Sequence, residues 1–230
     1  KSISMEVCSG EIFGIGGVAG NGQDELLAAF SGECMVSNAM INLHGKPIGQ
    51  KGPDYRRSIG LSCAPEERLG HSAAPNMNLI ENALITGCQR QSLSKRGIID
   101  WQKTQNFADS IITTFDVRTD SAVNTARSLS GGNLQKFVIG REILQKPEVL
   151  VVNQPTWGVD AAAAAAIRQA LIDLATDGSA VVLISQDLDE LLEISDRFAA
   201  LNAGTLSEIR ETSALTLDEV GLLMGGSSGD

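Results

Sequence analysis

The sequence predicts an α/β domain with a largely parallel β-sheet and a helical insert. Short apolar runs bounded by turn residues indicate strands at residues 11–15, 58–62, 149–152, 180–185 and 197–201. Three of these runs are continuous rather than alternating, which is typical of strands covered on both faces and therefore of a parallel sheet. A helix pattern separates the third and fourth strands, and strand, helix and strand together predict a right-handed crossover.

The crossover helix is indicated by its composition as well as by its spacing. Asp160 can cap its first turn, and the alanines at 161–166 have the highest helix propensity of any residue. From Ile167 onward, apolar side chains recur on one face at i, i+3, i+4 and i+7. We therefore expect this helix to pack that face against the sheet.

The middle of the chain, at about 75–145, is predicted to be a helical subdomain. One helix is expected after a cap at Asp100, and a second from near Gly132 to residue 145. We expect one domain over residues 1–224. The last residues, 225–230, have the composition of a linker and are predicted to form a flexible tail.

The composition excludes several classes of function. The 230 residues include 18 Lys and Arg against 28 Asp and Glu, a net charge of −10, so attraction to nucleic acid or anionic lipid is not expected. Four widely separated cysteines and two histidines argue against a zinc site or a disulfide framework and favour a reducing, cytosolic setting. Apolar runs stay below the roughly 18 residues of a membrane span, and we expect no secretory signal.

A glycine-rich segment follows the first strand and fits two phosphate-binding patterns. As G-x-G-x-x-A, it would begin a dinucleotide-binding helix with Gly14, Gly16 and Ala19. Glu33 would then be the ribose-binding acid, about 20 residues further on. That pattern places two more glycines inside the first helical turns, where each costs about 1 kcal/mol relative to Ala.

The second pattern, G-x-x-x-x-G, accounts for all the glycines. Gly17 to Gly22 would form a loop whose backbone amides surround phosphate, with a helix starting after Gly22. The next residues, Gln23 and Asp24, replace the Lys and the Ser or Thr of a nucleotide-hydrolysing loop. A strand-to-helix turn that binds no ligand is a third interpretation of the segment.

A second glycine motif, Leu-Ser-Gly-Gly-Asn-Leu-Gln-Lys at 129–136, precedes an apolar-periodic helix. Ser130, Gly131 and Gly132 would present a hydroxyl and unpaired amides at a helix N-terminus, where the helix dipole attracts anions. A simple cap needs Ser130 alone, because glycine weakens the first turn. The motif therefore favours anion binding over capping alone.

The sequence L-S-G-G-x-x-Q-K resembles the signature motif of ATP-binding cassette (ABC) proteins, the motor subunits of ABC transporters. A closer resemblance is to the second, C-terminal cassette of tandem-cassette bacterial importers for simple sugars and nucleosides, and it is carried by four other segments: Gly17–Gln23, Pro65–Arg68, Asn153–Thr156 and Ser185–Glu190. The resemblance implies a P-loop NTPase fold with a mostly parallel sheet, a small antiparallel β part and an α-helical subdomain. The other segments follow in the order of the family: the glycine loop, Cys63–Glu66 at the Q-loop, Val149–Gln154 at Walker B, Gly158–Asp160 at the D-loop and Ser185–Gln186 at the switch-histidine position.

The resemblance also assigns roles to residues. ATP and Mg²⁺ would be the cofactors, and each nucleotide would lie between one cassette's loop and the other's signature. The nucleotide-binding positions would be Gly17, Gly20, Asn21, Gly22, Gln23, Asp24, Glu66 and Asn153. The signature acting on a partner's nucleotide would be Ser130, Gly131, Gly132 and Gln135, with Asp160 in the D-loop and Trp157 either stacked at the cassette interface or buried.

The chain departs from the family at the charged positions of its own pocket. Where the family has Lys, Ser or Thr, Asp, Glu and His, this sequence has Gln23, Asp24, Asn153, Gln154 and Gln186. Gln154 can orient a water molecule but cannot accept its proton, and general-base assistance contributes ~10²–10⁴ in rate. We therefore expect a pocket that is hydrolytically weak or inactive, with Asp24 as the candidate Mg²⁺ ligand.

The family further implies a partner cassette, transmembrane permease subunits and, indirectly, a solute-binding protein, at the cytoplasmic face of the bacterial inner membrane. Glu66 and the helical region after it would face the permease. Two alternatives stay open. One is an active ATPase whose Gln23 and Asp24 still support Mg-ATP, and the other is a dinucleotide-dependent enzyme that uses Gly14, Gly16 and Glu33.

Overall fold

The computed structural model describes residues 3–225, which are built around a seven-stranded sheet in the order β10-β9-β1-β8-β7-β4, with β11 also paired to β9. The central strands are parallel to one another, and the two short strands β10 and β11 run antiparallel to β9. Their bounds are β1 Ile12–Gly16, β4 Leu61–Ala64, β7 Val149–Asn153, β8 Ala180–Ser185, β9 Arg197–Asn202, β10 Thr205–Leu206 and β11 Arg210–Glu211.

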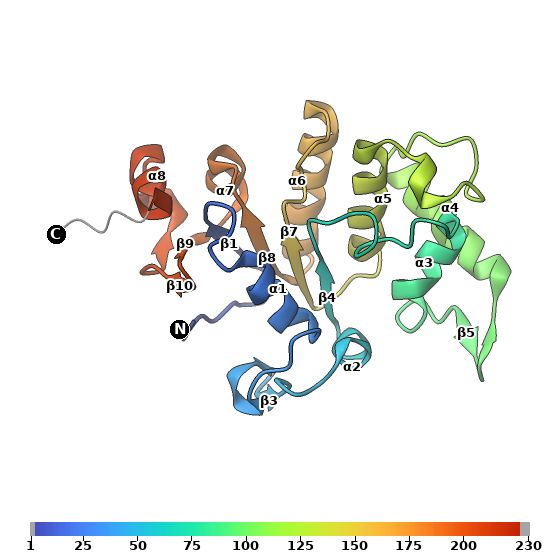
Figure 1. The fold of residues 1–230 in the computed structure, drawn as a ribbon, viewed down its shortest axis with the longest axis horizontal. Coiled ribbons are helices and arrows are strands. Elements are labelled where there is room, and N and C mark those ends of the chain that lie inside the picture. Colours follow the sequence, from blue (N-terminus) through green and yellow to red (C-terminus); the bar gives the residue numbers. More distant parts are fainter. Residues whose placement is uncertain (1–2, 226–230) are drawn as a thin grey trace.

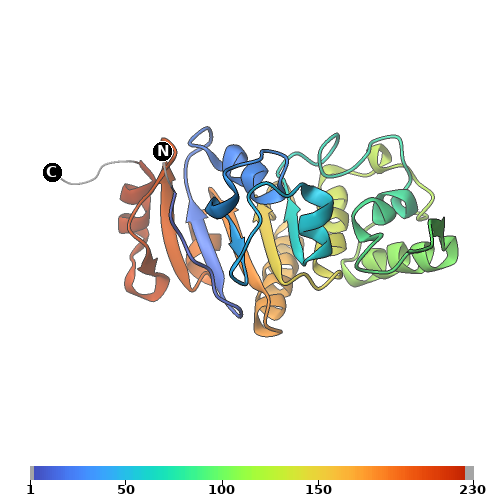
Figure 2. The ribbon, with the colours of Figure 1, turned by 90° about the horizontal axis from the view of Figure 1, so that it is seen from below.

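Side chains from the central strands pack into cores on both faces of the sheet. In β8, Val181 and Leu183 belong to one apolar cluster, whereas Val182 and Ile184 belong to another. Figure 2 shows the strands side by side, with α6 (Ala161–Thr176) on one side of them and α1 (Gln23–Ser31) on the other. This two-sided burial confirms the predicted α/β class and explains why the strands are continuously apolar.

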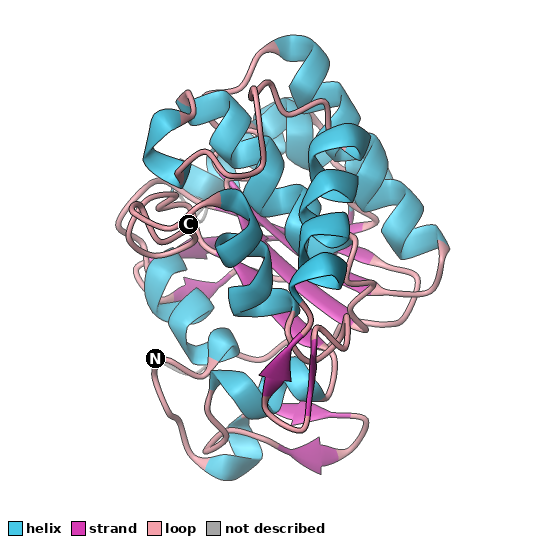
Figure 3. Ribbon diagram, turned by 90° about the vertical axis from the view of Figure 1, so that its right-hand side faces the viewer, coloured by secondary structure: helices cyan, strands magenta, loops and turns pink. Residues whose placement is uncertain are grey.

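The remaining helices and hairpins extend this core at both ends. Figure 1 shows α3, α4 and α5 gathered at one end of the molecule, and α8 at the other. Viewed from the α3 and α4 end (Figure 3), the helices stand in front of the long strands. The helix bounds are α2 Pro53–Ser58, α3 Leu79–Gly87, α4 Trp101–Thr114, α5 Gly131–Ile143, α7 Leu188–Ile194 and α8 Leu217–Gly225. Two hairpins complete the fold: β2 (Asn42–Leu43) pairs with β3 (Lys46–Pro47), and β5 (Ser94–Lys95) pairs with β6 (Ile98–Ile99).

Some predicted boundaries need correction. The strand expected at 58–62 starts at Leu61, because Ser58 completes α2 and Gly60 makes a turn with a φ of 97°. The helix expected to reach residue 145 ends at Ile143. Helix α8 includes Gly225, which we expected to begin the tail, and the rest of that predicted tail, 226–230, lies outside the described residues.

The predicted helix caps form as expected. The carboxylate of Asp160 accepts a hydrogen bond from the Ala163 amide at 2.9 Å, and that of Asp100 accepts one from the Lys103 amide, also at 2.9 Å. Because a cap satisfies an amide that the first turn leaves unpaired, both helices begin at the residue after the aspartate.

A buried ionic network fixes the position of α5. The carboxylate of Glu142 accepts hydrogen bonds from Arg57 at 2.7 Å and from Arg141 at 2.9 Å. Arg141 also donates to the carbonyls of Asn82 in α3 and Ser72, which follows β4. Burial alone would raise the pKa of Glu142, but the two guanidinium groups lower it, so the carboxylate stays charged. The network ties α5 to α2, α3 and the segment after β4.

Candidate functional site

The site lies where the parallel strands end. The carboxyl ends of β1, β4, β7 and β8 lie along one edge of the sheet and lead into the glycine loop, residues 65–68, Gln154 and Gln186. In open α/β sheets such an edge is where ligands bind. The structure therefore brings together segments that are widely separated in the sequence.

The glycine loop adopts the G-x-x-x-x-G arrangement. Strand β1 ends at Gly16 and α1 begins at Gln23, so the residues between them form a loop. Gly20 and Gly22 have φ values of 84° and 112°, a left-handed conformation that side chains disfavour. The dinucleotide arrangement required a helix starting near Gly16 and is therefore wrong. Its proposed ribose acid, Glu33, is instead paired with His71 at 3.0 Å.

The side chain of Gln23 closes this loop. Its amide nitrogen donates to the Val18 carbonyl at 2.9 Å, and its amide oxygen accepts from the Asn21 backbone at 3.0 Å. Asn21 is also tied to the turn between β9 and β10, because its side chain accepts from the Ala203 amide at 3.1 Å and its carbonyl accepts from the Gly204 amide at 2.9 Å. At least one loop amide that a phosphate would use is thus already bonded.

Asp24 and Asn153 form a polar pair beside the loop. The side-chain nitrogen of Asn153 donates to the Asp24 carboxylate at 3.3 Å. The other side-chain atom of Asn153, Oδ1, is buried without a hydrogen-bond partner among residues 3–225. A carboxylate and an amide oxygen are ligands that Mg²⁺ accepts, so the pair fits this cation. Within the described part of the chain, no group of three His, Cys, Asp or Glu side chains forms a metal-binding cluster.

The two glutamines at the expected catalytic positions contact each other. Gln154 has a φ of 53°, and its backbone amide donates to the Ile184 carbonyl at 2.8 Å. Its side-chain oxygen accepts a hydrogen bond from the backbone amide of Gln186 at 3.5 Å. Gln154 is buried. Neither amide side chain can take up a proton as a carboxylate or an imidazole does, so this pair can only orient a water molecule.

The signature turn forms the start of α5. The Ser130 hydroxyl accepts hydrogen bonds from the backbone of Asn133 at 3.4 Å and from its side chain at 2.9 Å, so it does cap the helix. Because it acts as an acceptor in both bonds, the hydroxyl proton remains for donation to an anion. Ser130 and Gly131 are exposed and Gly132 is half-buried. The turn therefore combines capping with an accessible helix N-terminus.

Gln135, predicted to act with the signature on a partner's nucleotide, faces inward. It is buried, and its side chain donates to the carbonyls of Gln154 at 3.2 Å and Pro155 at 2.9 Å. In this structure Gln135 holds the signature helix against the chain that follows β7. Such a contact across 19 positions cannot be read from helical spacing.

The other predicted residues lie at the surface. Asp160 caps α6, and the hydrogen bond from the Ala163 backbone lowers the pKa of its carboxyl group. Glu66 is exposed. Trp157 is 63% exposed, which rules out a buried position for its ring.

Arg68 and Glu190 stand in segments that resemble the family, but sequence reasoning assigned no role to either residue. Arg68 contacts the signature helix and the D-loop, and no sequence signal indicates either contact. Glu190 is buried, accepts a hydrogen bond from the Ser185 hydroxyl at 2.7 Å, and leaves its second oxygen without a partner in the described chain. Burial raises the pKa of Glu190.

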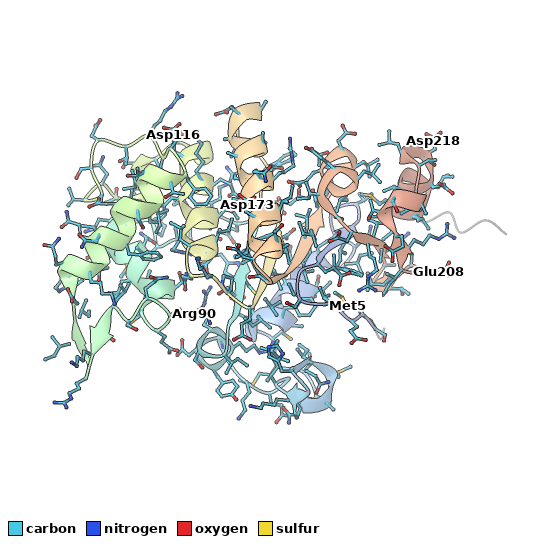
Figure 4. All side chains as sticks on the ribbon, turned by 180° about the vertical axis from the view of Figure 1, so that it is seen from behind. Met5, Arg90, Asp116, Asp173, Glu208 and Asp218 are labelled. Carbon is cyan, nitrogen blue, oxygen red and sulfur yellow. The ribbon has the colours of Figure 1, made fainter. Side chains whose placement is uncertain are left out.

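A groove of about 1030 Å³ lies at the opposite end of the strands and is separate from this site. Its walls include Met5, Leu61, Val149 and Ala180, the last three of which start β4, β7 and β8. Figure 4 shows Met5 on the lower side of the molecule and Asp116, which contacts Lys136 of the signature helix, on the upper side.

None of the helices within residues 3–225 is long and apolar enough to cross a bilayer.

The parallel sheet, the loop before α1 and the glycine start of α5 define a P-loop cassette. The family described as "ABC transporter" matches residues 1–157, and the chain belongs to this family. A solved structure described as an ATP-binding subunit of an ABC transporter has the same fold, with a TM-score of 0.77 at 18% identity, covering 97% of this chain and 91% of that one.

Two curated relatives refine this assignment. The chain is 37% identical over 228 residues to the "Nucleoside import ATP-binding protein NupA" of Lactococcus lactis subsp. cremoris, covering 99% of this chain and 45% of that protein. It is 36% identical over 230 residues to the "Glucose import ATP-binding protein TsgD13" of Haloferax volcanii, covering 98% and 42%. The chain thus spans less than half the length of these relatives.

Proposed function

We propose that this chain is the second, degenerate cassette of an ATP-binding subunit in an ABC importer for simple sugars or nucleosides. The names of the relatives, one a nucleoside and the other a glucose import protein, support this class of solute. Its partners would be a second cassette, permease subunits and, through them, a solute-binding protein. The chain would then act at the cytoplasmic face of the bacterial inner membrane.

The proposal is carried by the contrast between two glycine-rich turns at one edge of the fold. The chain's own loop is closed by Gln23 and is followed by the acidic side chain of Asp24. The signature turn keeps an exposed Ser130 and Gly131 at the start of a 13-residue helix. The second turn is therefore the better anion site, and it faces outward, where a partner's nucleotide would have to lie.

The residues around the chain's own loop would bind a nucleotide weakly and cleave it slowly. A phosphate would displace the Gln23 oxygen from the Asn21 amide, and a neutral amide in place of lysine forfeits on the order of 1 kcal/mol. Asp24 and Asn153 would hold Mg²⁺, which when bound offsets the charge of a triphosphate. Gln154 would orient water without removing its proton.

The signature would act on the nucleotide of the partner cassette. The Ser130 hydroxyl would donate a hydrogen bond to a phosphate oxygen, and the amides of the first turn would add to it. This arrangement supplies a catalytic group in trans, as an arginine finger does. Hydrolysis would therefore depend on this chain's signature more than on its own Walker residues.

The test compares two substitutions in the full-length protein assembled with its permease. Ser130→Phe should lower ATP turnover by ~10²-fold, the usual loss when a group that stabilises transition-state charge is removed. Gln154→Ala should change turnover by less than about two-fold, because a glutamine supplies no general base to lose. Ser128→Phe, two residues before Ser130 and also exposed, is the matched control for added bulk.

The reverse result would establish the active ATPase instead. If Gln154→Ala abolishes turnover and Ser130→Phe leaves it unchanged, hydrolysis occurs in this chain's own pocket. Calorimetry with Mg-ATP on the same variants separates loss of binding from loss of cleavage.

A further inference from the structure

Arg68 connects three segments whose relative positions matter in the proposed mechanism: the segment after β4, the signature helix and the D-loop. It lies four residues after the end of β4, in the segment that leads to the helical subdomain. Its Nε donates to the side chain of Gln135 in the signature helix at 2.9 Å, and a terminal nitrogen donates to the carbonyl of Trp157, the residue before the D-loop. One planar guanidinium group thus binds two segments that are separated by 22 positions.

Two glycines make room for this guanidinium group. A Cβ atom on Gly131 would lie 2.8 Å from one terminal nitrogen of Arg68, and a Cβ on Gly158 would lie 3.0 Å from the other. The first distance is shorter than Cβ contacts normally are and the second is tight, so a side chain at either position would displace the guanidinium group from its present place. The signature and the D-loop therefore each contribute a glycine to one slot, and Arg68 occupies it.

The electrostatics disfavour a cation at this place. The positive end of the α5 dipole is at Gly131, beside the guanidinium group. Burial lowers the pKa of Arg68, and Glu66 partly opposes this effect. Because the location is unfavourable for a positive charge, the hydrogen bonds and the packing must hold the side chain there.

The contacts of Arg68 continue in both directions. The Gln135 side chain in turn donates hydrogen bonds to the carbonyls of Gln154 and Pro155, which follow β7. On the other side, the carbonyl of Arg68 accepts from the Ala73 amide at 2.8 Å, and Ser72 is held by Arg141 of the buried network. The segment from 65 to 74 is therefore braced as a unit.

We propose that Arg68 is a positioning residue that makes segment 65–74, the signature turn and the D-loop move together. A permease that displaces the exposed Glu66 would thereby shift Gly131 and Gly158 relative to the partner's nucleotide. The inference rests on the proposed function, in which the signature acts in trans. In this proposal, the guanidinium group of Arg68 carries the displacement caused by the permease to the signature turn and the D-loop. It can do so because its planar group donates to two acceptors at once.

The experiment uses the full-length protein, free and assembled with its permease in vesicles of phosphatidylethanolamine and phosphatidylglycerol. Hydrogen exchange is followed by mass spectrometry in peptides covering 128–135 and 155–160, and ATP turnover is measured in both states. Arg68→Ala should accelerate exchange in both peptides and reduce the permease-dependent increase in turnover on the order of tenfold. Turnover of the unassembled protein should fall by less.

Arg68→Lys separates geometry from charge. An ammonium group keeps the positive charge but lacks the planar fork, so Lys should behave as Ala does. Full rescue by Lys would overturn the proposal and assign Arg68 to direct attraction of an anion. Unchanged exchange in Arg68→Ala would overturn it too. Arg127→Ala removes another arginine, which is exposed and lies three residues before Ser130, and serves as the matched control.

The exchange measurement distinguishes this inference from the proposed function. If Ser130→Phe leaves ATP turnover intact, the role of the signature in trans is wrong, whatever Arg68 does. If Ser130→Phe abolishes turnover while Arg68→Ala leaves both exchange and permease dependence unchanged, the proposed function stands and the role of Arg68 is wrong.

Discussion

The two glycine-rich turns that precede α1 and α5 differ in the hydrogen bonds made by the side chains next to the glycines. In the loop before α1, the cap residue is Gly22, and the Gln23 side chain bonds to the loop backbone on both sides. Before α5, Ser130 caps the helix and the following Gly131 stays exposed. Glycines allow a backbone to surround an anion, but the adjoining side chains decide whether the amides remain available.

The first turns of the two helices also differ in charge. The first turn of α1 contains Asp24 and Glu25, whereas the first turn of α5 contains no acid. Acidic side chains stabilise a helix N-terminus through the dipole, and they repel a phosphate there. Helix α1 has therefore gained local stability from groups that oppose phosphate binding, whereas α5 depends on anchoring at its other end.

That anchoring provides the largest expected effect. Glu142→Gln should leave Arg57 and Arg141 without their shared carboxylate and lower the free energy of unfolding by about 3–5 kcal/mol. Urea denaturation at neutral pH measures this loss. Glu193→Gln, at a partly exposed pair with Arg168, should cost about 1 kcal/mol or less. Equal losses in the two variants would contradict the importance of the buried network.

The same carboxylate predicts a pH dependence. The arginines lower the pKa of Glu142 in the folded chain, so its stabilisation is present above the ordinary carboxyl pKa of 4.5 and is lost as pH falls through the folded value. The stability difference between wild type and Glu142→Gln should therefore shrink in acid. A difference that grows on acidification would contradict the direction of this pKa shift.

Substitution of Gln23 is a direct way to make the two turns more alike. Gln23→Lys would free the Asn21 amide and exchange a neutral contact for a charge-assisted one, a gain on the order of 1 kcal/mol. Calorimetry should then show Mg-ATP binding tighter by roughly five- to tenfold. Gln102→Lys makes the same change of charge at an exposed position of α4. Equal affinity gains in both variants would show that only net charge matters.

Alanine substitutions at Gly17 and Gly131 compare how much the stability of the fold depends on a glycine in each of the two turns. A Cβ on Gly17 would lie 2.6 Å from the Leu201 carbonyl, a backbone atom, so Gly17→Ala should cost about 1–3 kcal/mol of stability. Gly131→Ala meets the movable end of Arg68 and should change stability by less than about 1 kcal/mol, because alanine favours helix. Thermal unfolding compares them, and the reverse order would contradict this geometry.

The smallest effect is expected at Glu190, in the first turn of α7. Burial raises its pKa, so the folded chain favours the protonated form, and stability falls as pH rises through the folded value. Glu190→Gln should slightly raise the melting temperature at pH 8, with the gain disappearing below pH 4.5, the ordinary carboxyl value. A variant less stable than wild type at pH 8 would show that the carboxylate is needed in its charged form.

Sequence reasoning succeeded where local physics decides the structure. Continuous apolar strands, the caps at Asp100 and Asp160, and the start of α1 follow from propensity and hydrogen bonding within a few residues. It failed where contacts cross the chain. The inward direction of Gln135 and the position of Arg68 depend on side chains that only the folded sheet brings together.

The two hydrogen bonds that join Asn21 to the turn at Ala203 and Gly204 have a thermodynamic consequence. A loop that is already fastened to a second part of the fold has lost much of its conformational entropy before any ligand arrives. A nucleotide would therefore gain from this rigidity only if it accepts the present shape of the loop. If it requires another shape, binding must also release the far edge of the sheet, and the heat absorbed in breaking those bonds would count against affinity.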